Sequence, residues 1–275
     1  MKEDLEFVVT ADRRKLFDWK ELWNYRELVY FFTWRDVKIK YKQTILGFAW
    51  AVLQPLLLMV IFTLFFGRAL SIPSQALPYP VFVFSGLILW NAFASGLTTS
   101  ANSMVNNAQI IKKIYFPRLI IPISSIFVSL FDFLMAFVLF IPLLIYYRQP
   151  VSMNVLWSWP SALLLTLIAT IGPGCLLSAL NVKYRDFRYV IPFLVQILFF
   201  LTPVIYPVSL LKYPLLQYLI VCSPMYAVVE LFRYPLTGIA LNTSFIVISV
   251  VSAGIFLLLG IVYFKRTEDF FADLA

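Results

Sequence analysis

The sequence predicts an all-α integral membrane protein with six transmembrane helices, an N-terminal interfacial amphipathic helix and two short re-entrant outer helices before the last span. Hydrophobic residues make up 61% of the chain and charged residues only 13%, which leaves too little polar surface for a water-soluble domain. Uncharged runs long enough to cross a hydrocarbon core of roughly 30 Å recur along the chain. Lys and Arg gather at alternate ends of these runs.

Residues 1–43 are predicted to form a cytoplasmic N-terminal segment that contains the interfacial helix. Within it, WKELWNYRELVYFFTWRDVKIKYKQ mixes aromatic residues with Lys, Arg and Glu at roughly helical spacing. Such a helix lies along the inner leaflet, and a simple membrane anchor would have the same pattern. The first 18 residues are too polar for a signal peptide, so we expect the N-terminus to stay in the cytoplasm.

Residues 44–264 are predicted to form the transmembrane domain, and residues 265–275 a cytoplasmic tail. Apolar runs that end at charges or at Pro and Gly clusters define the spans. The spans are expected near residues 44–66, 79–105, 119–146, 155–180, 189–207 and 243–264.

The distribution of positive charge predicts the orientation of these spans. Of the 22 Lys and Arg residues, 18 lie in the N-terminal segment, the loops at 106–118 and 181–188, and the tail. Cytoplasmic loops carry such an excess, so both termini are expected in the cytoplasm. The four cations on the opposite side are Arg68, Arg148, Lys212 and Arg233.

The segment 208–240 is apolar but is broken by Pro214, Pro224, Pro235 and Gly238. Proline frees backbone groups that need new partners, so such a segment persists at membrane depth only when it is packed in protein or lines a wet cavity. Two short re-entrant helices on the outer side fit this pattern.

Several kinds of site are not expected. The chain has no histidine, and Cys175 and Cys222 lie in apolar sequence without a pairing pattern, so neither a metal site nor a disulfide is indicated. The net charge of +8 lies beside apolar runs rather than in a separate basic domain. This placement favours membrane lipids over nucleic acid as the counter-charge.

Catalytic groups are also sparse. Asp132 is the one mid-span carboxylate, and Glu230 lies in the broken segment. Hydrolysis and acyl transfer need paired carboxylates or a nucleophile beside a base. A bond to Ser or Thr of a neighbouring helix explains Asp132, and a role in gating is the alternative. Because no Gly-rich phosphate loop is present, any ATP hydrolysis must come from another polypeptide.

Three blocks of sequence carry a resemblance to a known family. They are LWNYRELVYFFTWRDVKIKYKQTILGFAWAVLQPLL at 22–57, NAQIIKKIYFPRLIIP at 107–122, and LNVKYRDFRYVIPFLVQILFFLTPVIYP at 180–207, followed by SPMYAVVELFR at 223–233. They resemble the membrane subunit of bacterial ABC-2 type exporters of polysaccharides, the family that exports O-antigen, capsular polysaccharide and teichoic acid. The similarity covers nearly all of the chain beyond the first 20 residues.

This resemblance implies a homodimer around a central conduit in the bacterial cytoplasmic (inner) membrane, with two copies of a separate cytoplasmic ABC ATPase. ATP and Mg would bind to that partner, and this chain would bind no cofactor. We therefore predict a transport subunit, not an enzyme, that exports a lipid-linked polysaccharide. An ABC-2 exporter of a small hydrophobic compound and a membrane enzyme of glycan assembly are the alternatives.

The resemblance also implies a coupling helix that docks on the ATPase, within residues 107–118. The residues are compatible with docking, because Ile and aromatic side chains give an apolar face and Lys and Arg can meet acidic groups. Basic loops at span ends also bind lipid. The candidate coupling residues are Gln109, Ile110, Ile111, Lys112, Lys113, Ile114, Tyr115, Phe116 and Arg118.

In this family the first and fifth spans border the conduit. Sugar CH faces stack on aromatic rings, and Phe, Tyr and Trp make up 18% of the chain. The candidates for the lining, here called the conduit aromatics, are Phe48, Phe62, Phe66, Phe193, Phe199, Phe200 and Tyr206. Ordinary packing or lipid contact also explains each ring.

The lipid anchor of the polymer is expected to reach the conduit from the inner leaflet. Cations beside the interfacial helix could hold the pyrophosphate expected on such a carrier, and general attraction to anionic lipid explains them as well. These residues, here called the headgroup cations, are Arg35, Lys38, Lys40 and Lys42.

Overall fold

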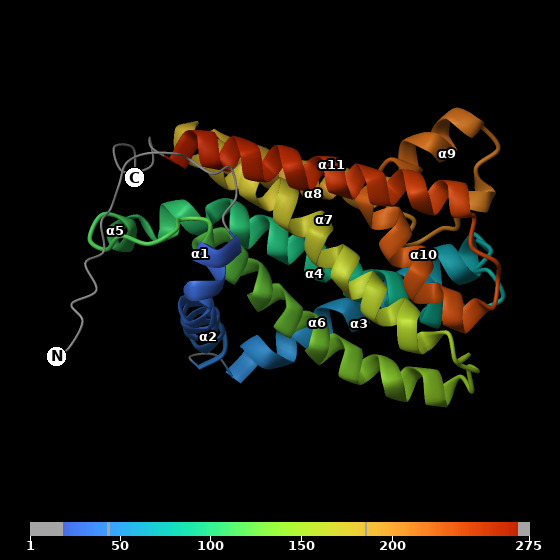
Figure 1. The fold of residues 1–275 in the computed structure, drawn as a ribbon. Helices are drawn as coiled ribbons and strands as arrows, with labels where there is room; N and C mark the ends of the chain where they lie inside the picture. The colour runs from blue at the N-terminus through green and yellow to red at the C-terminus, as the bar shows by residue number, and fades with distance from the viewer. Residues whose placement is uncertain (1–18, 43–44, 185, 269–275) are drawn as a thin grey trace.

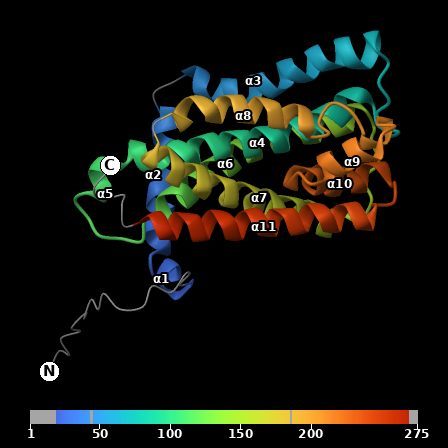
Figure 2. The ribbon, with the colours of Figure 1, turned by 90° about the horizontal axis from the view of Figure 1, so that it is seen from above.

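The computed structural model describes residues 19–42, 45–184 and 186–268, with the side chains of residues 19–21, 45–48 and 51 left out. The described residues form helices joined by turns and loops, without a strand, which confirms the all-α prediction. Long helices run side by side as a bundle (Figures 1 and 2). Helix α2 (Arg26–Lys42) and the short helix α5 (Ala108–Ile111) lie at one end, here the α2 end.

The predicted interfacial helix is present as α1 (Trp19–Asn24) followed by α2. Figure 2 shows α2 running across the end of the bundle, roughly at right angles to the long helices. Phe32 and Val37 are buried against the bundle, whereas Tyr30, Phe31 and Ile39 are exposed. This two-sided distribution is the one expected of a helix that lies in a membrane interface.

Among the described residues, five helices are long and apolar enough to cross a membrane. The first combines α3 (Ile45–Phe62) with a π-helical turn, η1 (Thr63–Ala69). The bounds of all five helices agree with the predicted spans to within three residues at each end. These other spans are α4 (Tyr79–Asn106), α6 (Ile120–Tyr146), α7 (Val155–Lys183) and α11 (Thr243–Thr267).

The fifth predicted span is shorter than expected. Helix α8 (Phe187–Leu201) has 15 residues and ends six residues before the predicted boundary at 207. At 1.5 Å per residue it is about 22 Å long, less than a hydrocarbon core of roughly 30 Å. Thr202 is extended (φ −95°, ψ 135°) because the following Pro203 disfavours helical backbone at the residue before it.

The broken segment forms two short helices, as predicted. After a 3-10 turn, η2 (Val208–Leu210), helices α9 (Pro214–Val221) and α10 (Pro224–Thr237) meet at 89°. Pro214 and Pro224 each occupy the start of a helix, where no backbone N–H is needed. Gly238 ends α10 with φ 65°, a conformation that glycine adopts without strain. Both helices lie at the end of the bundle opposite α5, here the α10 end (Figure 1).

Helix α4 occupies the centre of the bundle. In its most apolar window 78% of the residues are buried, against 11% for the first span and 17% for α11. Small residues allow the close crossings around it. Where α7 and α11 cross, a Cβ atom at Gly260 would lie 1.9 Å from the carbonyl oxygen of Gly172, so this contact needs glycine.

Candidate functional site

The predicted coupling segment projects from the α2 end but is partly anchored in the core. Ile111 and Phe116 are buried, and the Phe116 ring lies 5.7 Å from that of Phe32 on α2. Ile114 and Tyr115 point outward with 61% and 79% of their surface exposed. Residues 112–115, which also include two exposed lysines, are called the coupling tip below.

The other candidate coupling residues divide in the same way. Gln109 is exposed and Ile110 is half-buried. Arg118 turns back to the bundle, where its guanidinium donates to the backbone carbonyl of Glu268 and its N–H lies 3.3 Å from the Glu268 carboxylate. The segment therefore has a free tip and a base that is fixed to α2 and to the end of α11.

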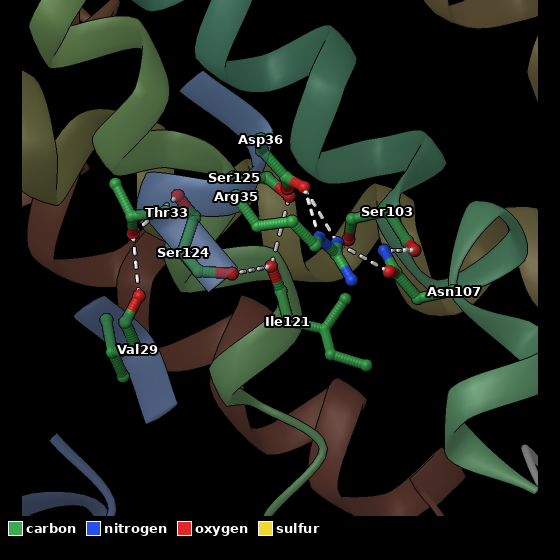
Figure 3. A network of polar contacts seen from close by, with 9 residues as sticks. All are labelled: Val29, Thr33, Arg35, Asp36, Ser103, Asn107, Ile121, Ser124 and Ser125. Carbon is green, nitrogen blue, oxygen red and sulfur yellow. Dashed lines mark hydrogen bonds and ion pairs between the residues drawn. The ribbon is translucent and has the colours of Figure 1, made fainter. Parts of the chain in front are cut away.

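A polar network links α2 to the base of this segment (Figure 3). The Arg35 guanidinium donates to the Asn107 side-chain oxygen at 2.8 Å and pairs with Asp36 at 2.7 Å. The Asn107 amide donates in turn to the carbonyl of Ser103 at 2.8 Å. Asn107 is the residue between α4 and α5, so one side chain of α2 contacts the hinge from which the coupling segment extends.

The far end of α2 holds the predicted mid-span carboxylate. The Asp132 carboxylate on α6 pairs with the Lys40 ammonium at 2.5 Å and accepts hydrogen bonds from the Tyr41 hydroxyl and, at 3.3 Å, from Ser95 on α4. The predicted serine partner is thus present, and two α2 residues join it. Burial, together with the bond to Asp132, raises the pKa of Tyr41, so its hydroxyl keeps the proton that it donates.

The headgroup cations take two different orientations. Arg35 and Lys40 turn toward the bundle and line cavities, each beside a carboxylate. Lys38 is exposed with its ammonium 5.3 Å from the Trp34 ring, and Lys42 is exposed as well. Lys38 and Lys42 are therefore placed like ordinary surface cations of an interfacial helix.

Two neighbouring cavities follow this surface of the bundle. The α2 cavity has a volume of about 610 Å³ between α2, α4, α5 and α6, and the span cavity has about 410 Å³ between α2, α3, α4, α6 and α8. Lys40 and Thr99 line both, so the two are adjacent. Both volumes lie in the range of about 300–1,000 Å³ that is typical of ligand sites.

The wall shared by the cavities is a polar stripe that the charge-based sequence analysis missed. Its successive members are four, three, one and seven positions apart, which keeps them on one face of α4 over about 22 Å at 1.5 Å per residue. The signal was present in the sequence as polar residues at helical spacing within an otherwise apolar span. This α4 polar stripe consists of Asn91, Ser95, Thr98, Thr99 and Asn106.

The conduit aromatics are brought together only in part. Phe62 on α3 stacks on Phe199 of α8 with ring centres 5.8 Å apart, and it also contacts Phe66. Phe199 lies beside Phe200, whose carbonyl accepts a hydrogen bond from Tyr206. This cluster closes the gap between α3 and α8 near their C-terminal ends. Phe193 is exposed and separate on α8, and the side chain of Phe48 lies outside the described residues.

Arg233, which was predicted as a cation of the outer side, is 1% exposed in the α10 end of the bundle. Its guanidinium donates to the carbonyls of Phe82, Pro203 and Val204, each at 2.8 Å, and to the Ser85 hydroxyl at 3.2 Å. These carbonyls come from α4 and from the break after α8. Arg233 therefore fixes the place where the short α8 ends.

In the part of the chain that the structure describes, no group of three or more His, Cys, Asp and Glu residues is positioned to hold a metal ion. The chemistry available in the described cavities is hydrogen bonding, ring stacking and paired charge.

Comparison with known proteins identifies the family. Residues 27–237 match the family model described as ABC-2 type transporter. An O-antigen export system permease protein RfbA of Klebsiella pneumoniae is 29% identical over 90% of this chain and 95% of its own length. The protein of that name in Myxococcus xanthus is 30% identical over 70% of this chain and 73% of its own length.

A more distant relative is the polysialic acid transport protein KpsM of Escherichia coli, which is 23% identical over 76% of this chain and 83% of its own length. The family match begins at the second residue of α2, ends at the last residue of α10, and includes five of the six predicted spans. The chain therefore belongs to the ABC-2 type transporter family.

Proposed function

We propose that this chain is the membrane-spanning permease subunit of an ATP-driven exporter of lipid-linked polysaccharide, resembling O-antigen, across the bacterial cytoplasmic membrane. The observation that carries this proposal is the similarity to O-antigen export permeases over 90% of the chain. Lys and Arg are in excess in the N-terminal segment, in the loops at 106–118 and 181–188, and in the tail. This excess supports an orientation with both termini in the cytoplasm.

Two copies of the chain would enclose the conduit. The helix that is too short to span alone, α8, exposes Tyr189, Phe193, Ile197 and Phe200 along one face at spacings of three or four residues. Helix α3 likewise exposes most of its apolar surface. A second copy of the chain and lipid would cover these faces. In a symmetric dimer the same surface of each subunit forms the interface.

Two copies of a separate ABC ATPase would bind at the α2 end, and ATP and Mg would be held by that partner. The coupling tip supports this arrangement, because it presents Ile114 and Tyr115 beside two lysines on a base fixed to the bundle. Exposed apolar side chains ringed by charge are typical of a surface that docks into a groove. Arg35 and Lys40, the two headgroup cations that line the α2 cavity, would hold the diphosphate of the lipid carrier at the same end.

The glycan would pass along the α4 polar stripe and the conduit aromatics toward the α10 end. Hydroxyls and amides exchange hydrogen bonds with sugar hydroxyls, and rings stack on sugar CH faces. Such contacts are individually weak, which suits a polymer that must slide. Helices α9 and α10 would close the route until ATP binding moves the coupling segment.

This proposal is tested by purifying the tagged chain from its native membrane in mild detergent and measuring the native mass and ATP hydrolysis of the complex. We expect two copies of this chain with two copies of an ATPase. Tyr115→Asp should release the ATPase, whereas Met153→Asp, an equally exposed position beyond the other end of the bundle, should not. A chain that purifies alone or with glycan-assembly enzymes would contradict the proposal.

A further inference from the structure

The span cavity has a lining that differs in character from that of the α2 cavity. Its polar groups are mostly uncharged amides and hydroxyls, accompanied by an aromatic ring. We propose that the span cavity binds uncharged sugar units of the polymer and discriminates against acidic sugars. This inference rests on the proposed function and adds the class of polymer to it. The residues that carry it are Trp50, Gln54, Asn91, Lys40 and Asp132.

Two amide side chains are available for sugar hydroxyls. Gln54 on α3 and Asn91 on α4 both line the cavity, and neither makes a hydrogen bond with another described residue. Each amide offers two N–H donors and a carbonyl acceptor. A sugar hydroxyl both donates and accepts, so neighbouring hydroxyls match an amide without any charge.

Trp50 supplies an apolar surface beside these amides. Its side chain lines the cavity and is 56% exposed. An indole face stacks on the CH face of a sugar ring, and this contact depends on the ring shape rather than on charge. Trp50 and Gln54 lie one turn apart on α3 and Asn91 lies on α4, so the indole would hold the face of a sugar ring and the amides its hydroxyls.

The threonine hydroxyls of the stripe can make only weak contacts with a sugar. Thr98 donates its hydroxyl proton to the carbonyl of Ala94 and Thr99 to that of Ser95, each at 2.8 Å. Their remaining capacity is as acceptors. They therefore add polarity for passing sugars without creating a deep minimum that would stop the polymer.

The charges of the span cavity oppose an acidic sugar. Lys40 and Asp132 are the charged residues among the described lining, and their ammonium and carboxylate pair at 2.5 Å. Their charges cancel, so the pair gives the carboxylate of an acidic sugar no net positive charge to compensate it. Moving an ionised group into a partly buried site without a compensating charge is costly, so the lining selects by exclusion.

The adjacent α2 cavity is suited to the anionic part of the substrate instead. Its described lining includes Arg35, whose guanidinium pairs with Asp36 at 2.7 Å and would exchange that carboxylate for phosphate oxygens. A carrier diphosphate in the α2 cavity would place the first sugars beside the span cavity. Charge recognition and sugar recognition are then divided between the two neighbouring cavities.

Family membership does not fix this property, because one relative is named for transport of polysialic acid, which is an acidic polymer. The α4 polar stripe and the amides of the span cavity are features of this chain. The inference is therefore about the polymer that this member accepts.

The test measures binding of hexasaccharides to the reconstituted permease–ATPase complex by saturation-transfer NMR. The neutral probes are hexamers of glucose, mannose and galactose, and the acidic probes are hexamers of galacturonic acid and of sialic acid. We expect at least one neutral hexamer to bind at least fivefold more tightly than either acidic one. Equal or tighter binding of an acidic hexamer, or no binding of any neutral one, would overturn the inference.

Two variants connect that preference to the cavity. Gln54→Ala combined with Asn91→Ala should weaken binding of the neutral hexamer at least tenfold, whereas Asn154→Ala, an amide outside the cavity, should leave it unchanged. Asp132→Asn removes a negative charge and should improve binding of the galacturonic acid hexamer, unlike Asp186→Asn, which lies outside the cavity. Unchanged binding in the cavity variants would refute the assignment, while an intact ATPase complex would leave the proposed function standing.

Discussion

At the scale of single residues, Arg233 shows how a buried charge can determine where a helix ends. Its guanidinium donates to the Pro203 and Val204 carbonyls, which the break after α8 would otherwise leave without partners, and to the Phe82 carbonyl of α4, which also accepts from the Ser85 hydroxyl. The Phe82 ring packs on it with the guanidinium carbon 3.6 Å from the ring centre. The planar fork of Arg can reach several acceptors at once, which a lysine ammonium cannot.

We predict that Arg233→Met destabilises the fold by at least about 2 kcal/mol, because the Pro203 and Val204 carbonyls are then left unpaired and each costs about 1–3 kcal/mol. Arg233→Lys should recover only part of that loss. Thermal unfolding in detergent measures the effect, with the exposed Lys212→Met as a control for loss of a cation near the same end. A melting temperature of Arg233→Met equal to that of the wild type would disprove this role.

A second residue-scale prediction concerns the Lys40–Asp132 pair. Because 39% of the Lys40 side chain is exposed, the pair should add only about 0.2–1 kcal/mol to stability. Its importance lies in position, since it joins α2 to α6 at the wall of both cavities. Lys40→Asp and Asp132→Lys should each reduce export strongly, and the double swap should restore a large part of it.

The swap also separates two roles of Lys40. If Lys40 acted only on the lipid headgroup, the double variant would remain as inactive as Lys40→Asp, because the cation would have moved to α6. Export is measured in cells as polymer that reaches the outer surface. Control measurements of membrane content exclude loss of the protein as the cause.

The partners of polar side chains were predictable from the sequence only where the type of residue and its place in a span indicated them. The serine partner of Asp132 was expected because intramembrane carboxylates seek hydroxyls of neighbouring helices. The pairing with Lys40 was not, since the two residues are 92 positions apart and only the tertiary fold brings them together. The hydrogen-bond partners of Arg233 could not be predicted for the same reason, since Phe82 lies 151 positions away in the sequence.

At the scale of elements, α2 connects the coupling segment to the cavities. It contacts Asn107 near its middle through Arg35 and the middle of α6 near its end through Lys40 and Tyr41. A rigid helix fixed at both points moves as one body. If the segment couples to an ATPase as proposed, its displacement would therefore reach the cavity wall through α2.

We predict that Asn107→Ala uncouples ATP hydrolysis from export, because Arg35 then loses its acceptor at the hinge. Polymer exported per ATP hydrolysed should fall severalfold while the ATPase remains bound. Asn107→Asp keeps an oxygen acceptor for Arg35 and should retain coupling. Equal loss in the two variants would show that the Asn107 side chain matters for another reason. Both quantities are measured on the reconstituted complex.

Helix α11 contains two glycines, Gly254 and Gly260, that serve as a test and a control for its packing on α7. A Cβ at Gly260 would collide with the Gly172 backbone, whereas a Cβ at Gly254 meets no atom within 4 Å. Gly260→Ala should cost about 1–3 kcal/mol by forcing the helices apart. Gly254→Ala should be neutral or stabilise by up to about 1 kcal/mol through helix propensity. Thermal unfolding of the two variants checks the difference, and similar melting temperatures would contradict it.

Element boundaries were predictable at charged residues and at the prolines of the segment 208–240. The proline positions in 208–240 correctly predicted two short helices, because Pro214 and Pro224 can only begin a helix there. The end of α8 was predicted too late, because the apolar run continues past Pro203 and hydrophobicity alone does not register the break. The amphipathic α2 was expected, but its contacts with α6 were not.

At the scale of the whole molecule, the two ends of the bundle differ in the features that they present. The α2 end gathers the coupling tip, the exposed cations of α2 and the α2 cavity, whereas the α10 end is closed by the bent pair α9–α10 and Arg233. The α4 polar stripe extends from the α2 end to about the middle of α4. Fold class and family followed from composition, span lengths and sequence blocks, while the stripe became visible only once the cavities were known.

The most direct test of the central claim is ATP-driven movement of lipid-linked polysaccharide in inverted membrane vesicles that contain this chain and its ATPase. The account predicts that ATP and Mg make the polymer inaccessible to an added glycosidase, and that Tyr115→Asp abolishes this protection. Polymer that stays accessible although the ATPase is bound and hydrolysing ATP, or protection that needs no ATP, would contradict the account.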